Sequence, residues 1–271
     1  MRPFNKLIIL AILAASCAAV FGEPTRLPIQ IGSLSYEIPI PAGFASVGPE
    51  DPAFAAVENV AAGNKLCALF MEAERASSSP SGSIAGRTCN VQISRQLIHR
   101  PCNKTSLEQA LKETAEEQVR IQREAAVVMK NSGVAVDQIE AHPIHDRSER
   151  HFSYVMILHQ NDRKLAVVTS VVLLKARLLY CYVNCPVNGD TDISGAQTTA
   201  KDWVSRLIAL NPSDAATTAV ENQQPGLDGI TIGLFAALIA AGGIALWLIH
   251  RRKVKNGQSR KDHGIGPVEM Q

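Results

Sequence analysis

The stretch LAVVTSVVLLKARLLYCYVNCP, residues 165–186, decides the fold. Its first ten residues are almost all apolar and β-branched, which is typical of a strand that is covered on both faces of a sheet. Residues 175–177 interrupt the apolar run and predict a turn into the next strand. A similar turn is expected at residues 161–162. Residues 151–185 are therefore predicted to form three consecutive antiparallel strands.

Shorter runs earlier in the chain predict the rest of the sheet. Apolar residues partly alternate in PIQIGSLSYEIPI, residues 28–40, and predict one strand that ends at the turn of residues 41–43. Two further strands are expected at residues 65–72 and 87–97. Together with the three later strands they are expected to form an antiparallel sheet.

Three segments have helical patterns. Residues 52–62 predict a short helix. Thr105 and Glu108 fit a capping box at the start of a long helix, and Gly133 stands where a C-terminal glycine belongs. Residues 193–210 have the clearest amphipathic period. Together with the strands they predict an α+β fold, an antiparallel sheet flanked by helices.

The element order of residues 27–211 resembles the layout of the PsbP/Mog1-like α/β/α sandwich. The opening strand that runs into IPIPAGF, the three-strand meander and the closing amphipathic helix carry the resemblance. It implies an accessory protein, either extracytoplasmic and membrane-attached or a cytoplasmic GTPase-binding factor. It supplies no catalytic residue. The long helix expected at residues 105–133 departs from that layout.

The first 22 residues have the order of a secretory signal peptide. Arg2 and Lys6 precede an apolar run that is too short to span a bilayer comfortably, and small residues follow up to Gly22. Cys17 leaves lipidation as an alternative. Residues 23–212 are therefore expected to form one exported domain.

A second apolar segment predicts a C-terminal transmembrane helix. Residues 230–249 are twenty positions without a charge, enough to cross a hydrocarbon core of roughly 30 Å at about 1.5 Å per residue. The tail, residues 250–271, holds 6 Lys and Arg against 2 Asp and Glu. Because positive charge stays inside, the tail is expected in the cytoplasm. Residues 213–229 are small and polar, which predicts a flexible stalk.

The charge distribution argues against a nucleic-acid partner. Residues 23–229 hold 19 Lys and Arg against 23 Asp and Glu, so the expected outer part is mildly acidic. Anionic lipid and topology explain the basic tail. Small residues recur every four positions in the predicted span, a pattern that permits close helix packing: Gly233, Ala237, Ala241 and Ala245. The expected partners are the lipid bilayer and either another protein or a second copy bound through this helix.

Cys181 and Cys185 stand four apart in the last predicted strand. In one extended strand they are separated by roughly 13 Å, whereas a disulfide needs Cα atoms within about 7 Å. An oxidising compartment favours disulfides, so each is expected to pair elsewhere, with Cys89 and Cys102 as candidates. Cys67 is the expected free thiol. Inert buried thiols, or redox or metal chemistry, are the alternatives.

Three histidines within ten residues are the candidate metal ligands: His142, His145 and His151. Neutral imidazole suits zinc, copper or nickel, and Asp146 could add a carboxylate. The spacing matches no established ligand set, and solvated loop histidines are the ordinary alternative. The nucleophile-elbow, P-loop and dinucleotide motifs are missing, and no cofactor is expected.

These features predict a single-pass protein of a bacterial inner membrane. Its periplasmic domain is expected to be a non-catalytic accessory module that binds a partner or ligand. The alternative is a metal-binding or catalytic domain that uses His142, His145 and His151. The short signal, and a single glycosylation sequon at residues 103–105, favour a bacterial origin.

Overall fold

The computed structural model describes residues 25–60, 63–73, 86–116, 137–160, 163–214 and 217–219. The strands are β1 (Arg26–Ile31), β2 (Leu34–Pro39), β3 (Phe44–Val47), β4 (Asn64–Glu72), β5 (Thr88–Ser94), β6 (Gln138–Ala141), β7 (Asp146–Arg147), β8 (His151–Gln160), β9 (Arg163–Leu174) and β10 (Arg177–Val187). The helices are α2 (Pro52–Val60), α4 (Lys104–Glu116) and α6 (Asp190–Leu210), with a short 3-10 helix, η1 (Arg95–Leu97).

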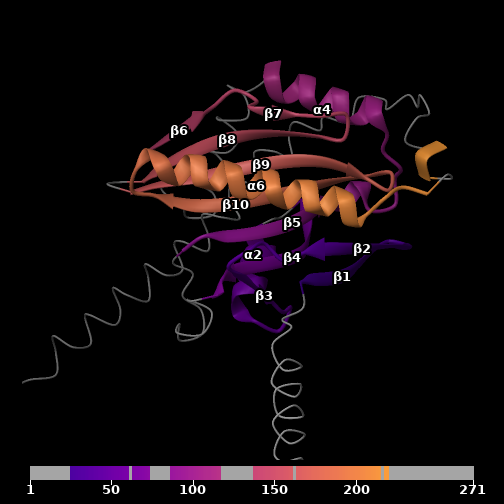
Figure 1. Cartoon of the computed structure of the whole chain (residues 1–271), viewed down its shortest axis with the longest axis horizontal. Helices are drawn as coiled ribbons and strands as arrows, with labels where there is room; N and C mark the ends of the chain where they lie inside the picture. Colours follow the sequence, from indigo (N-terminus) through magenta and orange to yellow (C-terminus); the bar gives the residue numbers. More distant parts are fainter. Residues whose placement is uncertain are drawn as a thin grey trace, which may run out of the picture.

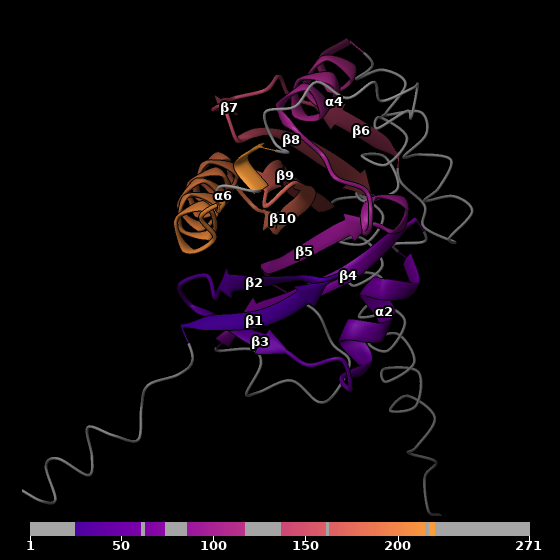
Figure 2. The ribbon, with the colours of Figure 1, turned by 90° about the vertical axis from the view of Figure 1, so that its right-hand side faces the viewer.

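One antiparallel sheet organises the described residues (Figure 1). Its strand order is β3-β4-β5-β10-β9-β8-β6, and β7 also pairs with β8. Figure 2 shows α6 on one side of this sheet, and α2 and α4 on the other. The predicted α+β class, an antiparallel sheet flanked by helices, is confirmed for these residues.

The predicted three-strand meander is confirmed as β8, β9 and β10. β9 lies between the other two, and every residue from Leu165 to Leu174 is buried, as its apolar β-branched sequence predicted. Lys175 and Ala176 form the turn into β10 with φ of 44° and 55°. Positive φ at both positions matches the twist of a two-residue hairpin but strains residues other than glycine. The expected turn at residues 161–162 lies outside the described residues.

The prediction of one strand over residues 28–40 is wrong, because this segment is a hairpin. Ile31 pairs with Leu34 across a two-residue turn in which Gly32 has φ of +60°. Glycine adopts this conformation without steric cost. The resulting β1-β2 hairpin is a separate two-stranded sheet that packs beside α6.

Helices α2 and α6 confirm the predicted short and amphipathic helices. Helix α4 begins earlier than predicted, because Asn103 and not Thr105 caps it. The Oδ1 atom of Asn103 accepts a hydrogen bond from the Ser106 backbone N–H at 2.9 Å, and the Ser106 hydroxyl accepts one from the Asn103 N–H at 3.1 Å. This is a reciprocal capping arrangement. The rest of the helix predicted up to Gly133 lies outside the described residues.

The two faces of the sheet differ in polarity. The face under α6 is an apolar core. The other face is apolar beneath α4 and beneath α2, and it also carries a set of buried residues with polar groups, of which Tyr154, Tyr180 and Tyr182 belong to the core beneath α4. We call this set the polar stripe: Asn64 of β4; Thr88, Asn90, Gln92 and Ser94 of β5; Tyr180, Tyr182 and Asn184 of β10; Thr169 of β9; and Tyr154 of β8. None of these residues is more than 3% exposed.

Several predicted segments fall outside the described residues. These are the signal peptide (residues 1–22, with Cys17), the transmembrane helix (230–249, with Gly233, Ala237, Ala241 and Ala245) and the tail (250–271). The stalk is described only at residues 213–214 and 217–219. In the part of the chain that is described, no helix is both long and apolar enough to cross a membrane.

Candidate functional site

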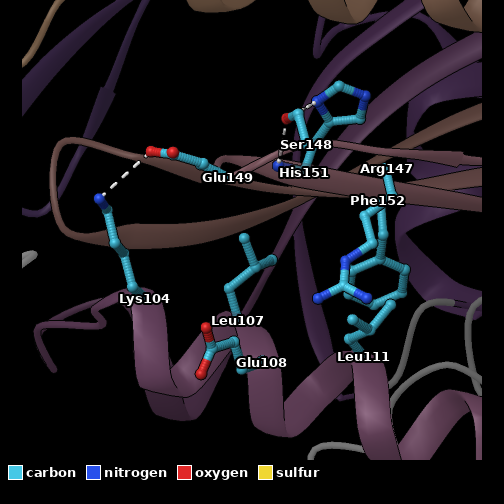
Figure 3. A pocket seen from close by; sticks show the side chains of 9 residues that line it. All are labelled: Lys104, Leu107, Glu108, Leu111, Arg147, Ser148, Glu149, His151 and Phe152. Carbon is cyan, nitrogen blue, oxygen red and sulfur yellow. Dashed lines mark hydrogen bonds and ion pairs between the residues drawn. The ribbon is translucent and has the colours of Figure 1, made fainter.

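A groove runs between helix α4 and the segment that leads from β7 into β8. It has two adjoining parts with volumes of about 520 Å³ and about 630 Å³. Glu108, Leu111 and Arg147 line both parts, so they form one continuous depression, which we call the α4 groove. Figure 3 shows its first part. Each part by itself has a volume in the range of ligand-binding clefts, about 300–1,000 Å³.

The floor of the α4 groove is apolar. Leu107 and Phe152 are buried in the core beneath α4, and Leu111 and Ile144 pack against the same core while remaining partly exposed. Figure 3 shows Phe152 and Leu111 facing each other across the groove, with Arg147 alongside. An apolar side chain that entered here would be removed from water on several sides.

The helical period puts floor and rim residues on one side of α4. Lys104, Leu107, Glu108 and Leu111 are spaced at i, i+3, i+4 and i+7, so they share a helix face. The cap at Asn103 fixes where this face begins. The local sequence of α4 therefore sets the position of the groove along the helix.

The rim of the groove carries charges of both signs. Glu108 and Arg147 stand along it, and at one end Lys104 Nζ lies 3.4 Å from Glu149 Oε2, joining the start of α4 to the β7–β8 turn. The Glu149 side chain is 85% exposed. Exposed ion pairs of this kind contribute only about 0–1 kcal/mol. This end of the groove can therefore open at little energetic cost.

His151 is the first residue of β8 and borders the groove, but its imidazole ring does not point into it (Figure 3). Its Nδ1 atom lies 2.7 Å from the Ser148 hydroxyl, and its Nε2 atom lies 3.2 Å from Asp146 Oδ2. Figure 3 shows the imidazole ring on the side of the strand that faces away from α4. His151 also lies opposite Val172, which belongs to the core under α6. The sequence analysis offered Asp146 as a further metal ligand beside the three histidines and gave no role to Ser148.

The Asp146, His151 and Ser148 contacts resemble a hydrolase triad in composition, but the Ser148 hydroxyl is already engaged. It accepts hydrogen bonds from the backbone N–H groups of Arg150, at 3.1 Å, and of His151, at 3.2 Å. These bonds occupy the lone pairs that a nucleophile would use, and they are the bonds of a serine-stabilised turn. The trio therefore fastens the turn that forms one wall of the α4 groove.

The other two predicted metal ligands have different surroundings. His142 Nε2 lies 3.2 Å from Glu140 Oε1, and His159 Nε2 lies 3.5 Å from the other oxygen of that carboxylate. Loss of solvation lowers the pKa of His145. Among the described residues, no three His, Cys, Asp or Glu side chains are placed to hold a metal ion. The geometry gives the three histidines no common centre, because His151 is directed into the β7–β8 turn.

The five cysteines of the described residues are free thiols. Cys181 and Cys185 both lie in the continuous strand β10, so the expectation that they cannot bridge each other is confirmed. Cys89 lies opposite Val183, which stands between them, on the face under α6. Cys102 lies in the core of the other face, so the sheet separates it from Cys89, Cys181 and Cys185. Burial raises the pKa of the Cys67 thiol to about 12.

The fold and groove define an α+β domain with an open, apolar-floored cleft, and comparisons with known proteins add no family. No family model matches the chain, and no curated protein matches it. The Ran-binding protein Mog1p of Saccharomyces cerevisiae is similar at 10% identity over 69% of this chain and 92% of that chain, with a TM-score of 0.31. A Mog1 mutant structure gives the same identity and coverage with a TM-score of 0.30. At these values the PsbP/Mog1 resemblance stays a prediction.

Proposed function

We propose that this chain is a single-pass membrane protein whose extracytoplasmic domain binds another envelope protein, without catalysis. The α4 groove is the observation that carries the proposal. Its apolar floor accepts side chains, and its rim of both charge signs supplies polar contacts around them, which is the usual anatomy of a protein-binding site.

The dimensions of the groove favour an extended segment as the bound element. Lys104 to Ala115, the lining residues furthest apart on α4, are eleven positions apart, or about 16 Å of helix. About five residues of extended chain cover that length. Alternate side chains of such a segment would reach the floor at Leu107 and Leu111, while the others would face the rim.

The membrane arrangement is supported by the sequence. An apolar segment of signal-peptide length precedes residues 23–212, and an uncharged segment of twenty residues followed by basic residues comes after them. The groove would then face the periplasm. The histidine-based alternative has less support, because among the described residues no three His, Cys, Asp or Glu side chains are placed to hold a metal ion.

Site-specific photo-crosslinking in living cells tests the groove. A photoreactive residue at Lys112, which is exposed on the groove, is expected to give a discrete adduct with another protein. The same residue at Lys201, which is exposed on α6 on the opposite side of the sheet, is the matched control and should give none. Leu111→Asp, combined with the photoreactive residue at position 112, should abolish the adduct, since it places a charge on the apolar floor of the groove. Equal adducts at both positions, or an adduct unaffected by Leu111→Asp, would contradict the proposal.

A further inference from the structure

Strand β7 is an edge of the sheet and borders the α4 groove. In the part of the chain that the structure describes, β7 pairs with β8 alone. Figures 1 and 2 both show α4 at the β6–β7 end of the sheet. Residues 144–147 line the second part of the groove. Asp146 is among them although its carboxylate is turned towards His151, so the backbone of β7 forms part of this wall.

The hydrogen-bonding register directs the backbone of Arg147 outward from this edge. The Ser148 N–H donates to His151 O at 2.8 Å, so the next pair along the ladder, Arg147 and Phe152, is one that exchanges no backbone hydrogen bonds. Residues of such a pair direct their N–H and C=O groups away from the partner strand. Arg147 therefore presents one backbone donor and one backbone acceptor at the outer edge of the sheet.

Two features keep this open edge short. The His145 N–H donates to Ser153 O at 3.1 Å, and Asp146 also lies opposite Ser153, so two residues oppose one as in a β-bulge. Pro143 has no N–H to offer. Bulges and prolines limit the pairing of edge strands. A strand added here would therefore be only a few residues long, which agrees with the length of the α4 groove.

The charges beside β7 favour an acidic residue on the bound segment. Lys112 and Arg147 are exposed on the second part of the groove, and neither has an ion-pair partner among the described residues. Glu108 supplies one counter-charge, whereas the Asp146 carboxylate is held by His151. Loss of solvation lowers the pKa of His145, which therefore stays neutral at pH 7. One carboxylate on the bound segment would complement this part of the groove.

We propose that the segment bound in the α4 groove joins the sheet as a short additional strand beside β7. Its main chain exchanges hydrogen bonds with the N–H and C=O groups of Arg147, and its alternate side chains lie on the floor at Leu111 and Ile144. A carboxylate on the segment pairs with Arg147 or Lys112. This inference rests on the proposed function, because it specifies how the segment of the partner protein is held.

Photo-crosslinking from position 112 in living cells tests the added strand. Arg147→Pro removes the outward N–H, and proline is tolerated at such an edge position. Arg147→Ala removes the same side chain but keeps the backbone donor, so it is the matched control. The yield of the adduct should be about tenfold lower in Arg147→Pro than in Arg147→Ala. Equal yields in the two variants would overturn the added strand and leave the proposed function standing, whereas the absence of any adduct without these substitutions would overturn both.

Hydrogen exchange provides a second readout that needs no substitution at Arg147. In the uncrosslinked full-length protein, purified in mild detergent, the Arg147 amide should exchange faster than the Ser148 amide, which is bonded to His151 O. In the purified adduct, exchange of the Arg147 amide should be at least about tenfold slower than in the uncrosslinked protein. An Arg147 amide that is already protected before crosslinking, or that exchanges at the same rate in the adduct, would overturn the proposal.

Discussion

The indole nitrogen of Trp203 donates a hydrogen bond to the carbonyl oxygen of Pro39 at 2.7 Å, although the two residues are 164 positions apart. Trp203 is 2% exposed and meets Phe70 edge-to-face, with ring centroids 5.9 Å apart. One side chain of α6 therefore joins the β1-β2 hairpin to strand β4 of the main sheet.

Trp203→Phe is expected to lower the free energy of unfolding by about 2–4 kcal/mol. The change leaves the Pro39 carbonyl without its donor and opens a cavity in the core under α6. Urea denaturation followed by circular dichroism measures the difference. Lys201→Ala, at an exposed position on the same helix, should change stability by less than about 0.5 kcal/mol. Similar losses in the two variants would contradict the role assigned to Trp203.

Asn211 is expected to be nearly as important as Trp203, because its side chain fastens the end of α6 to β2. Its Oδ1 atom accepts from the Glu37 N–H at 2.9 Å, and its Nδ2 donates to Glu37 O at 2.8 Å and to Leu207 O at 2.9 Å. Asn211→Ala should cost about 2–3 kcal/mol of stability in the same denaturation assay. Asn211→Asp keeps the Oδ1 acceptor but removes the Nδ2 group that donates to Glu37 O and Leu207 O. An unfolding midpoint equal to that of the wild type in this variant would refute the role given to these two hydrogen bonds.

Ala176→Gly is expected to stabilise the protein by about 0.5–1 kcal/mol. Ala176 has φ of 55°, which strains a residue with a Cβ atom, and relief of that strain should exceed the added entropy of the unfolded chain. The same substitution at Ala115, exposed on helix α4, is the matched control and should cost about 1 kcal/mol. Thermal melts would show shifts of opposite sign. A melting temperature of Ala176→Gly below that of the wild type would contradict the claim that the backbone of Ala176 is strained.

The placement of the cysteines restricts which disulfides an oxidising compartment can produce. Cys89 is diagonal to both Cys181 and Cys185 on the face under α6, whereas Cys102 lies beneath the opposite face. Any bridge among these four is expected to join Cys89 to Cys181 or Cys185. Mass-spectrometric mapping after non-reducing digestion would show it. A bridge that includes Cys102 would contradict the observed sheet.

Thiols that remain free are expected to be almost inert in the folded protein. Burial raises the pKa of Cys67 to about 12 and that of Cys185 to about 11, so the reactive thiolate is scarce until the pH approaches those values. At pH 8, iodoacetamide should label both at least about a hundredfold more slowly than in denaturant. Labelling at equal rates in native and denatured protein would show that these side chains are exposed.

Local sequence patterns predicted much of the sheet. The unbroken β-branched run of residues 165–174 identified β9 as a central strand, because only a strand covered on both faces tolerates that composition. The β1-β2 hairpin was missed because apolar alternation continues on both sides of Gly32, which hides a two-residue turn. The cap of α4 was misplaced because Asn103, like Thr105, has a side chain that can cap a helix.

The candidate sites required tertiary information. The α4 groove exists only where the helix face of Leu107 and Leu111 meets Arg147, and nothing in either segment alone specifies that meeting. Alternation in β5 shows that Asn90 and Gln92 share a face, but it cannot show that this face is buried. The nearness of His142 to His151 in sequence likewise does not reveal the contacts of His151, which lies against Asp146 and Ser148.

The extracytoplasmic position of the α+β domain is tested most directly by reporter fusions in cells. A phosphatase that is active only outside the cytosol would be fused after Leu210 in one strain and after Gln271 in another. Activity after Leu210 and none after Gln271 is the predicted result. An inactive phosphatase after Leu210, at a position where a fluorescent protein restricted to the cytosol is bright, would contradict export of the domain and the proposed function with it.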